Sequence, residues 1–120
     1  TLNPGSAAEE PLIYAVDIEN KEIDPESLSK SMFIFGEHSR EMISAETGLH
    51  LVRQLCEKEP NKNINISQIL QKNKFRLVIN SNPISRKLVE DGSYCQRTNE
   101  NDVDINRNWD AHWSKVTLSD

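Results

Sequence analysis

The sequence has little of several features that mark common classes of protein. Its 120 residues carry 14 Lys and Arg against 19 Asp and Glu, so it lacks the basic excess that binds the phosphates of long nucleic acids. No apolar run approaches the roughly 20 residues of a membrane-spanning helix. Hydrophobic residues make up 36% and Gly adds 4 residues, which stays below the roughly 45–50% of a typical globular chain. We therefore expect no nucleic-acid partner, no membrane span, and a chain that forms part of a larger fold.

Cysteine is also scarce. Cys56 and Cys95 are too few for a disulfide framework and lack the spacing of a zinc finger. They permit one bridge or two free thiols, and the sequence does not decide between these states or indicate a compartment.

The sequence contains three short apolar runs and one segment whose apolar residues recur at helical spacing. Residues 12–18, 31–35 and 75–79 each predict a strand. Apolar residues recur at helical spacing over 49–56, and Ser44 is the predicted N-cap of that helix. The order strand–helix–strand indicates a crossover, and the nearly all-apolar second strand suggests a sheet buried on both faces. The predicted fold class is α/β, with a mixed, largely parallel sheet and flanking helices.

The rest of the chain is more polar. Residues 1–11 predict a flexible N-terminal segment, and Ser67 is the predicted cap of a short helix that reaches Leu70. Residues 84–120 are mostly polar and rich in turn-forming residues.

The first candidate for chemistry is the segment GEHSRE at 36–41, between the second strand and the helix. His38 and Glu41 are three residues apart, so a tight turn or helix puts them on the same side. Imidazole and carboxylate are both good zinc ligands, but two ligands do not make a site. The competing interpretation is a solvated helix start whose glutamate interacts favourably with the helix dipole.

The second candidate is the amide-rich segment 97–109. Arginine presents a planar fork that matches a carboxylate or an oxyanion, and asparagine adds a neutral donor. Asp104 is placed to orient an imidazole from outside a metal's ligand shell. The competing interpretation is a polar loop with asparagine turns.

Together these segments resemble the zinc metallocarboxypeptidases, a family that includes carboxypeptidases A, B and N. The likeness lies in FGEHSREMIS at 35–44 and DINRNW at 104–109. Between them, INSNP at 79–83 is similar to the family's NPDG strand end, although the two residues after Pro83 replace its Asp and Gly. Three ordered segments are far more specific than one. The resemblance covers roughly residues 12–113, so residues 12–120 are expected to be the N-terminal part of such a catalytic domain.

The resemblance implies a role for each candidate residue. His38 and Glu41 would be the first two zinc ligands, and Asp104 would support the histidine from outside the metal's shell. Arg97 would be the catalytic arginine that polarises the scissile carbonyl and stabilises the oxyanion. The substrate-contacting residues would be Arg40, and Asn106 with Arg107 as the pair that binds the substrate's terminal carboxylate.

The implied activity is zinc-dependent hydrolysis of the C-terminal peptide bond of peptides or proteins, in which zinc activates a water and a glutamate is the general base. Arg40 favours the A/B/N-like branch over the deglutamylating branch, and the resemblance favours a secretory route. Asn106 and Arg107 with Arg97 suit a peptide C-terminus better than the substrate of a deacylase of the same fold. The alternative is a non-catalytic carboxypeptidase-like isoform or binding module.

The family's third zinc ligand, a histidine, lies far downstream, with a substrate-side tyrosine and the catalytic glutamate, and the sequence stops at Asp120 before all three. His50 follows His38 by 12 residues, about 18 Å along a helix, so they could not share an ion. It is expected to be a surface helix residue. His112 falls where the family has no ligand. We expect the isolated chain to be an inactive fragment with weak or absent zinc binding.

Overall fold

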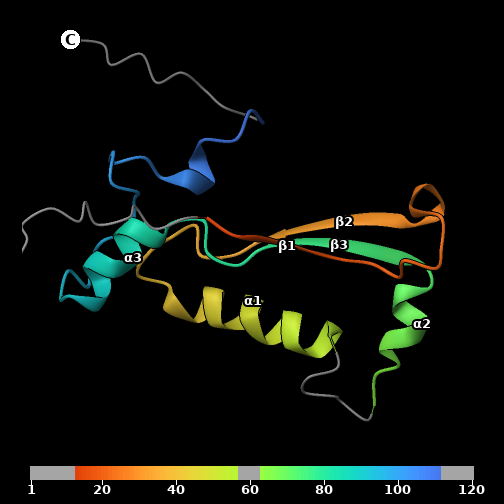
Figure 1. The fold of residues 1–120 in the computed structure, drawn as a ribbon. Coiled ribbons are helices and arrows are strands. Elements are labelled where there is room, and N and C mark those ends of the chain that lie inside the picture. The colour runs from red at the N-terminus through yellow and green to blue at the C-terminus, as the bar shows by residue number, and fades with distance from the viewer. Residues whose placement is uncertain (1–12, 57–62, 112–120) are drawn as a thin grey trace, which may run out of the picture.

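Three strands form one sheet in the computed structural model, which describes residues 13–56 and 63–111. Strand β1 spans Ala15–Ile18, β2 spans Ser29–Ile34 and β3 spans Asn73–Val78. The order is β1-β3-β2, with β3 parallel to β2 and antiparallel to β1 (Figure 1). The predicted mixed α/β sheet is therefore confirmed, and the strands lie within a few residues of their predicted positions.

Helix α1, Met42–Leu55, connects β2 to the part of the chain that precedes β3. It begins earlier than predicted, with Glu41 in the N-cap position and no side-chain cap bond. The prediction of Ser44 as N-cap is wrong, because its hydroxyl accepts a hydrogen bond from the backbone N–H of Gly36 at 3.0 Å. The serine therefore holds the end of the preceding strand against the first turn of the helix.

Two further helices follow. Helix α2, Ile66–Leu70, is capped by Asn65, whose Oδ1 accepts from the backbone N–H of Gln68 at 3.0 Å. Ser67 lies inside α2, so its prediction as the cap is wrong. Helix α3, Pro83–Glu90, was not predicted, because its eight residues contain too few apolar side chains for a clear helical stripe. Two short 3-10 turns, Pro25–Ser27 and Ile105–Arg107, complete the elements.

The hydrophobic core lies between one face of the sheet and helices α1 and α2. Its buried members are Ile18 and Leu77 from the sheet, Leu55 from α1 and Ile66 from α2. Leu77, on the central strand, is 0% exposed. This packing fixes α1 relative to β2 and β3. It therefore also fixes the turn just before α1, which contains His38 and Glu41.

The second strand is not buried on both faces. Met32 is 60% exposed and Phe33 is 40% exposed, although adjacent residues of a strand point to opposite faces. The prediction of a doubly buried strand is therefore wrong for the described residues, where β2 is an edge strand and α1 and α2 pack on one face only.

The structure also bears on the cysteines and on the length of the helices. Cys56 and Cys95 are free, exposed thiols, so of the two states left open they adopt the unbridged one. Within 13–56 and 63–111, no helix combines the length and the apolar character needed to cross a membrane. The predicted flexible segment 1–11 and His112 lie outside the described residues.

Candidate active site

The candidate site forms at the edge where β2 and β3 both end. Ile34 is paired with Val78 in the parallel register, so the chain leaves both strands at the same edge, which is where ligands bind in open α/β sheets. Gly36 turns the chain there with a φ of +71°, and a Cβ at this position would lie 2.7 Å from Oδ1 of Asn80. Only glycine fits this turn, and the turn leads directly into His38.

His38 is held between two carboxylates. Its Nδ1 lies 3.0 Å from Oε2 of Glu41, and its Nε2 lies 3.1 Å from Oδ1 of Asp104. The backbone N–H of Glu41 donates to the carbonyl of His38 at 3.0 Å, which closes the turn that brings the two side chains together. The ring is 9% exposed. Its orientation is therefore fixed, with Nδ1 and the Glu41 carboxylate facing each other.

Arg97 connects the same two carboxylates from the opposite side. Its Nε donates to Oδ2 of Asp104 at 2.8 Å, and its Nη1 donates to Oε1 of Glu41 at 3.3 Å. The hydrogen bond from Arg97 is the main reason that the pKa of Asp104 lies below its ordinary value, and the bond from His38 acts in the same direction. His38, Glu41, Arg97 and Asp104 thus form a closed ring of contacts, the His38 cluster.

The donor set of this cluster fits part of a zinc site. An imidazole nitrogen and a carboxylate oxygen are ordinary zinc ligands, and a carboxylate on the other ring nitrogen is the usual outer support of a zinc-bound histidine. His38, Glu41 and Asp104 supply these three parts. Among the described residues, however, no three His, Cys, Asp or Glu side chains are arranged to hold one metal ion. His50 is exposed on α1, as predicted.

The other predicted site residues lie around the cluster with exposed side chains. The backbone N–H of Asn106 donates to Oδ1 of Asp104 at 3.1 Å, so the carboxylate that holds His38 also starts the turn Ile105–Arg107. Arg107 donates through Nη1 to the carbonyl of Asn106 at 3.0 Å, and Arg40 donates to the carbonyl of Cys95 at 3.5 Å. Among the described residues, none of these three side chains forms a hydrogen bond with the His38 cluster.

Several contacts between the two segments were not predicted. Ser39 is 2% exposed, and its hydroxyl donates to the carbonyl of Gln96 at 2.8 Å. Trp109 is 50% exposed and donates through Nε1 to Oε1 of Glu37 at 3.1 Å. Asn82 also contacts both segments, through bonds to the carbonyls of Glu37 and Thr98. No local pattern marks these residues, because their partners are distant in the sequence.

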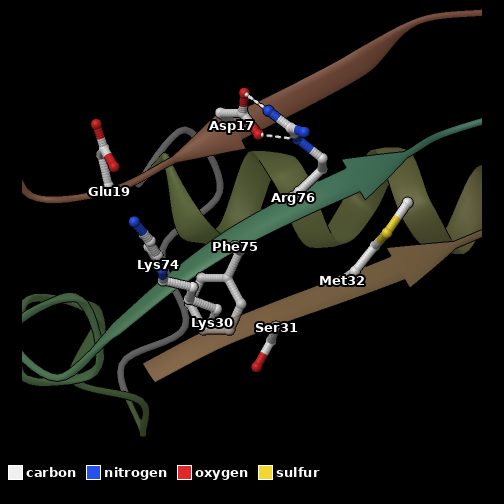
Figure 2. Close-up of a pocket in the computed structure, with 8 residues that line it drawn as sticks. All are labelled: Asp17, Glu19, Lys30, Ser31, Met32, Lys74, Phe75 and Arg76. Atoms are coloured by element: carbon white, nitrogen blue, oxygen red, sulfur yellow. Dashed lines mark hydrogen bonds and ion pairs between the residues drawn. The ribbon is translucent and has the colours of Figure 1, made fainter. Parts of the chain in front are cut away.

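A hollow of about 410 Å³ lies away from the His38 cluster. Figure 2 shows it on the face of the sheet that points away from α1, where Arg76 forms two bonds with Asp17, at 2.6 and 2.8 Å. None of the predicted site residues lines it. The charged side chains around it include Lys30 and Lys74, which both pair with Glu26. We regard this hollow as a feature of the sheet surface and not as part of the candidate site.

Comparison with known proteins bears on the family and the fold of the chain. A sequence profile described as zinc carboxypeptidase matches residues 2–120. No curated protein matches the chain. Among solved structures, the chain is similar to the crystal structure of thrombin activatable fibrinolysis inhibitor (TAFI), with a TM-score of 0.73 and 22% sequence identity. The match covers 91% of this chain but 29% of the other, so the chain spans less than a third of that protein's length, and at this identity the likeness concerns the fold. The profile match over nearly the whole sequence shows that the chain belongs to the zinc carboxypeptidase family.

Proposed function

We propose that this chain supplies the first two zinc ligands and the substrate-carboxylate residues of a metallocarboxypeptidase that removes the C-terminal residue of peptides or proteins. The observation that carries the proposal is the double hold on His38, whose Nε2 contacts Asp104 while its Nδ1 faces Glu41. A solvated helix start would need neither contact, since a surface histidine satisfies both ring nitrogens with water.

His38 and Glu41 would hold the zinc ion. When bound, zinc polarises the peptide carbonyl and lowers the pKa of a water molecule. With zinc bound, Asp104 would accept a hydrogen bond from the Nε2–H of His38 and so leave Nδ1 available as the ligand atom. This division of the imidazole between one metal and one carboxylate explains why the aspartate lies on the opposite side of the ring from Glu41.

Arg97 would stabilise the negative charge that develops on the carbonyl oxygen. Its side chain is fixed by Asp104 and Glu41 before any substrate binds, so little rearrangement is needed when the charge appears. An arginine suits this position because its planar fork of donors can keep one nitrogen on Asp104 while another meets the substrate.

The exposed pair of Asn106 and Arg107 would bind the substrate's terminal carboxylate, and Arg40, also exposed, would contact the substrate. A guanidinium fork matches the two oxygens of a carboxylate, and an amide adds a neutral donor. The turn Ile105–Arg107 begins on the carboxylate of Asp104. The spacing between the carboxylate-binding pair and the metal-binding histidine is therefore set by one residue, which is what an exopeptidase requires.

The third protein ligand to zinc and the general base would come from residues beyond Asp120. The test is zinc-dependent release of C-terminal amino acids from a peptide mixture, measured for the 120-residue chain and for a polypeptide extended past Asp120 along its gene. We expect no turnover by the chain alone and turnover by the extended polypeptide. A non-catalytic homologue would instead bind peptides with a free C-terminus without hydrolysis in both forms, and that result would contradict the proposal.

A further inference from the structure

The side chain of Asn82 joins the two segments that build the candidate site. Its Nδ2 donates to the backbone carbonyl of Glu37 at 3.2 Å and to that of Thr98 at 3.1 Å. Glu37 precedes His38 and Thr98 follows Arg97, so a single amide group binds the chain neighbours of both residues. Asn82 is 2% exposed, and water therefore does not compete for these two bonds.

Asn82 does not perform the local role that its position indicates. It is the N-cap of α3, where an asparagine side chain ordinarily accepts a bond from the first turn of the helix. Helix α3 has no side-chain cap bond, and among the described residues Oδ1 of Asn82 is buried without a partner. An unpaired buried oxygen is unfavourable. The two bonds donated by Nδ2 are what the side chain gains by turning away from its helix.

A second set of contacts runs beside this bridge. The backbone N–H of Ser39 donates to the carbonyl of Arg97 at 3.3 Å, and the Ser39 hydroxyl donates to the carbonyl of Gln96 at 2.8 Å. Residues 37–39 and 96–98 therefore lie side by side, with Asn82 reaching across from the end of β3. The three segments come from separate parts of the chain, and these contacts help to fix their relative positions next to the metal-ligand candidates.

We propose that Asn82 is a positioning residue for this site. Its amide locks the segment of His38 to the segment of Arg97, and so keeps both side chains on the shared carboxylate of Asp104. The contacts described above support the positioning of the two segments by Asn82. The effect of this positioning on metal and substrate binding rests on the function proposed in the preceding subsection.

The test uses Asn82→Ser in the 120-residue chain, studied by NMR without added metal. Serine caps a helix about as well as asparagine, so α3 keeps its start, but one hydroxyl cannot donate to two carbonyls at once. The matched control is Asn65→Ala, which removes the cap bond of α2 at 3.0 Å. Helix α2 lies at the opposite end of the sheet from α3 (Figure 1). The control therefore lowers stability without touching the bridge.

Two signals report on the bridge. The first is the exchange rate of the Ser39 amide proton relative to that of Phe35, which donates within the sheet to Val78 at 2.9 Å. The second is the ring Nε2 proton of His38, which its contact with Asp104 protects. We expect Asn82→Ser to raise the relative exchange rate of Ser39 about tenfold, the effect of losing about one hydrogen bond, and to remove the His38 ring signal. Asn65→Ala should change neither.

An unchanged relative exchange rate of Ser39 and an unchanged His38 ring signal in Asn82→Ser would overturn the proposal. A zinc titration of the unsubstituted chain is run separately. If zinc binds at another place and leaves His38 unaffected, the proposed function fails, while the exchange measurements still decide whether Asn82 locks the two segments.

Discussion

The Nε2 atom of His38 lies 3.1 Å from Oδ1 of Asp104, although 66 residues separate the two in the sequence. The same carboxylate accepts from Nε of Arg97 at 2.8 Å and from the backbone N–H of Asn106 at 3.1 Å. One aspartate therefore orients the candidate zinc ligand, the candidate catalytic arginine and the turn that carries the candidate carboxylate-binding pair.

Removing Asp104 should weaken zinc binding without removing a ligand. Loss of such outer support of a metal-binding histidine typically lowers metal affinity about 10–100-fold. We expect Asp104→Ala to fall in this range in the polypeptide extended past Asp120, measured by competition titration against a chromophoric chelator. Asp17→Ala is the matched control, since Asp17 also bonds an arginine, Arg76, but on the far face of the sheet. Equal zinc affinities for the two variants would contradict the role assigned to Asp104.

The turn at Gly36 should not tolerate a side chain. Gly36→Ala places a Cβ 2.7 Å from Oδ1 of Asn80 and forces a non-glycine residue to a φ of +71°. We expect the free energy of unfolding to fall by about 2 kcal/mol or more, measured by urea denaturation. Gly92→Ala has a φ of +114° with no atom within 4 Å of the added Cβ, so it tests backbone strain alone. Gly36→Ala should be the more destabilising of the two, and the reverse order would contradict the steric account.

The pair of Asp17 and Arg76 should make stability depend on pH in the acid range. The hydrogen bond from Arg76 holds the pKa of Asp17 below its ordinary value of 3.8. Because the folded pKa is lower than the unfolded pKa, this contribution is present above the unfolded value and is lost as the pH falls through the folded value.

Thermal melts of the unsubstituted chain and of Arg76→Gln, recorded from about pH 7 down to about pH 2, measure this effect. The two melting temperatures should differ most above about pH 5 and should converge at the acid end. Both side chains are exposed, so added salt should also reduce the difference. A difference that grows on acidification would contradict the assignment.

The packing of the sheet against α1 and α2 should depend on Leu77. This residue is 0% exposed, and Leu77→Ala should lower the free energy of unfolding by about 2–5 kcal/mol. Met32→Ala, on the edge strand at 60% exposure, should change it by less than about 0.5 kcal/mol. Urea denaturation of both variants provides the measurement, and similar losses would mean that the core is placed wrongly.

Much of this arrangement follows from local sequence patterns. The apolar runs predicted all three strands, and the helical stripe predicted most of α1. The pairing of His38 with Glu41 followed from their spacing. That Asp104 and Arg97 join this pair could be anticipated only from the family resemblance, because no periodicity relates residues more than fifty positions apart.

Other features depend on tertiary contacts that local patterns do not record. Ser44 is a good capping residue by type, but its hydroxyl bonds Gly36 instead. Asn82 is likewise a good capping residue by type, but its side chain bonds the carbonyls of Glu37 and Thr98 instead of capping α3. The apolar run of β2 predicted burial on both faces, whereas Met32 remains exposed, because burial is set by what packs on a strand and not by the strand itself.

His38 and Glu41 are proposed to bind zinc through the Nδ1 atom and the carboxylate that face each other at 3.0 Å. The most direct measurement is an NMR titration of the 120-residue chain with zinc to millimolar concentration, followed through the histidine ring nitrogens and repeated with His38→Ala and His50→Ala. We predict weak binding that shifts Nδ1 of His38 and the carboxylate of Glu41, survives in His50→Ala and is lost in His38→Ala. Zinc that binds while leaving the His38 ring unchanged, or that binds equally well to His38→Ala, would show that His38 is not a ligand.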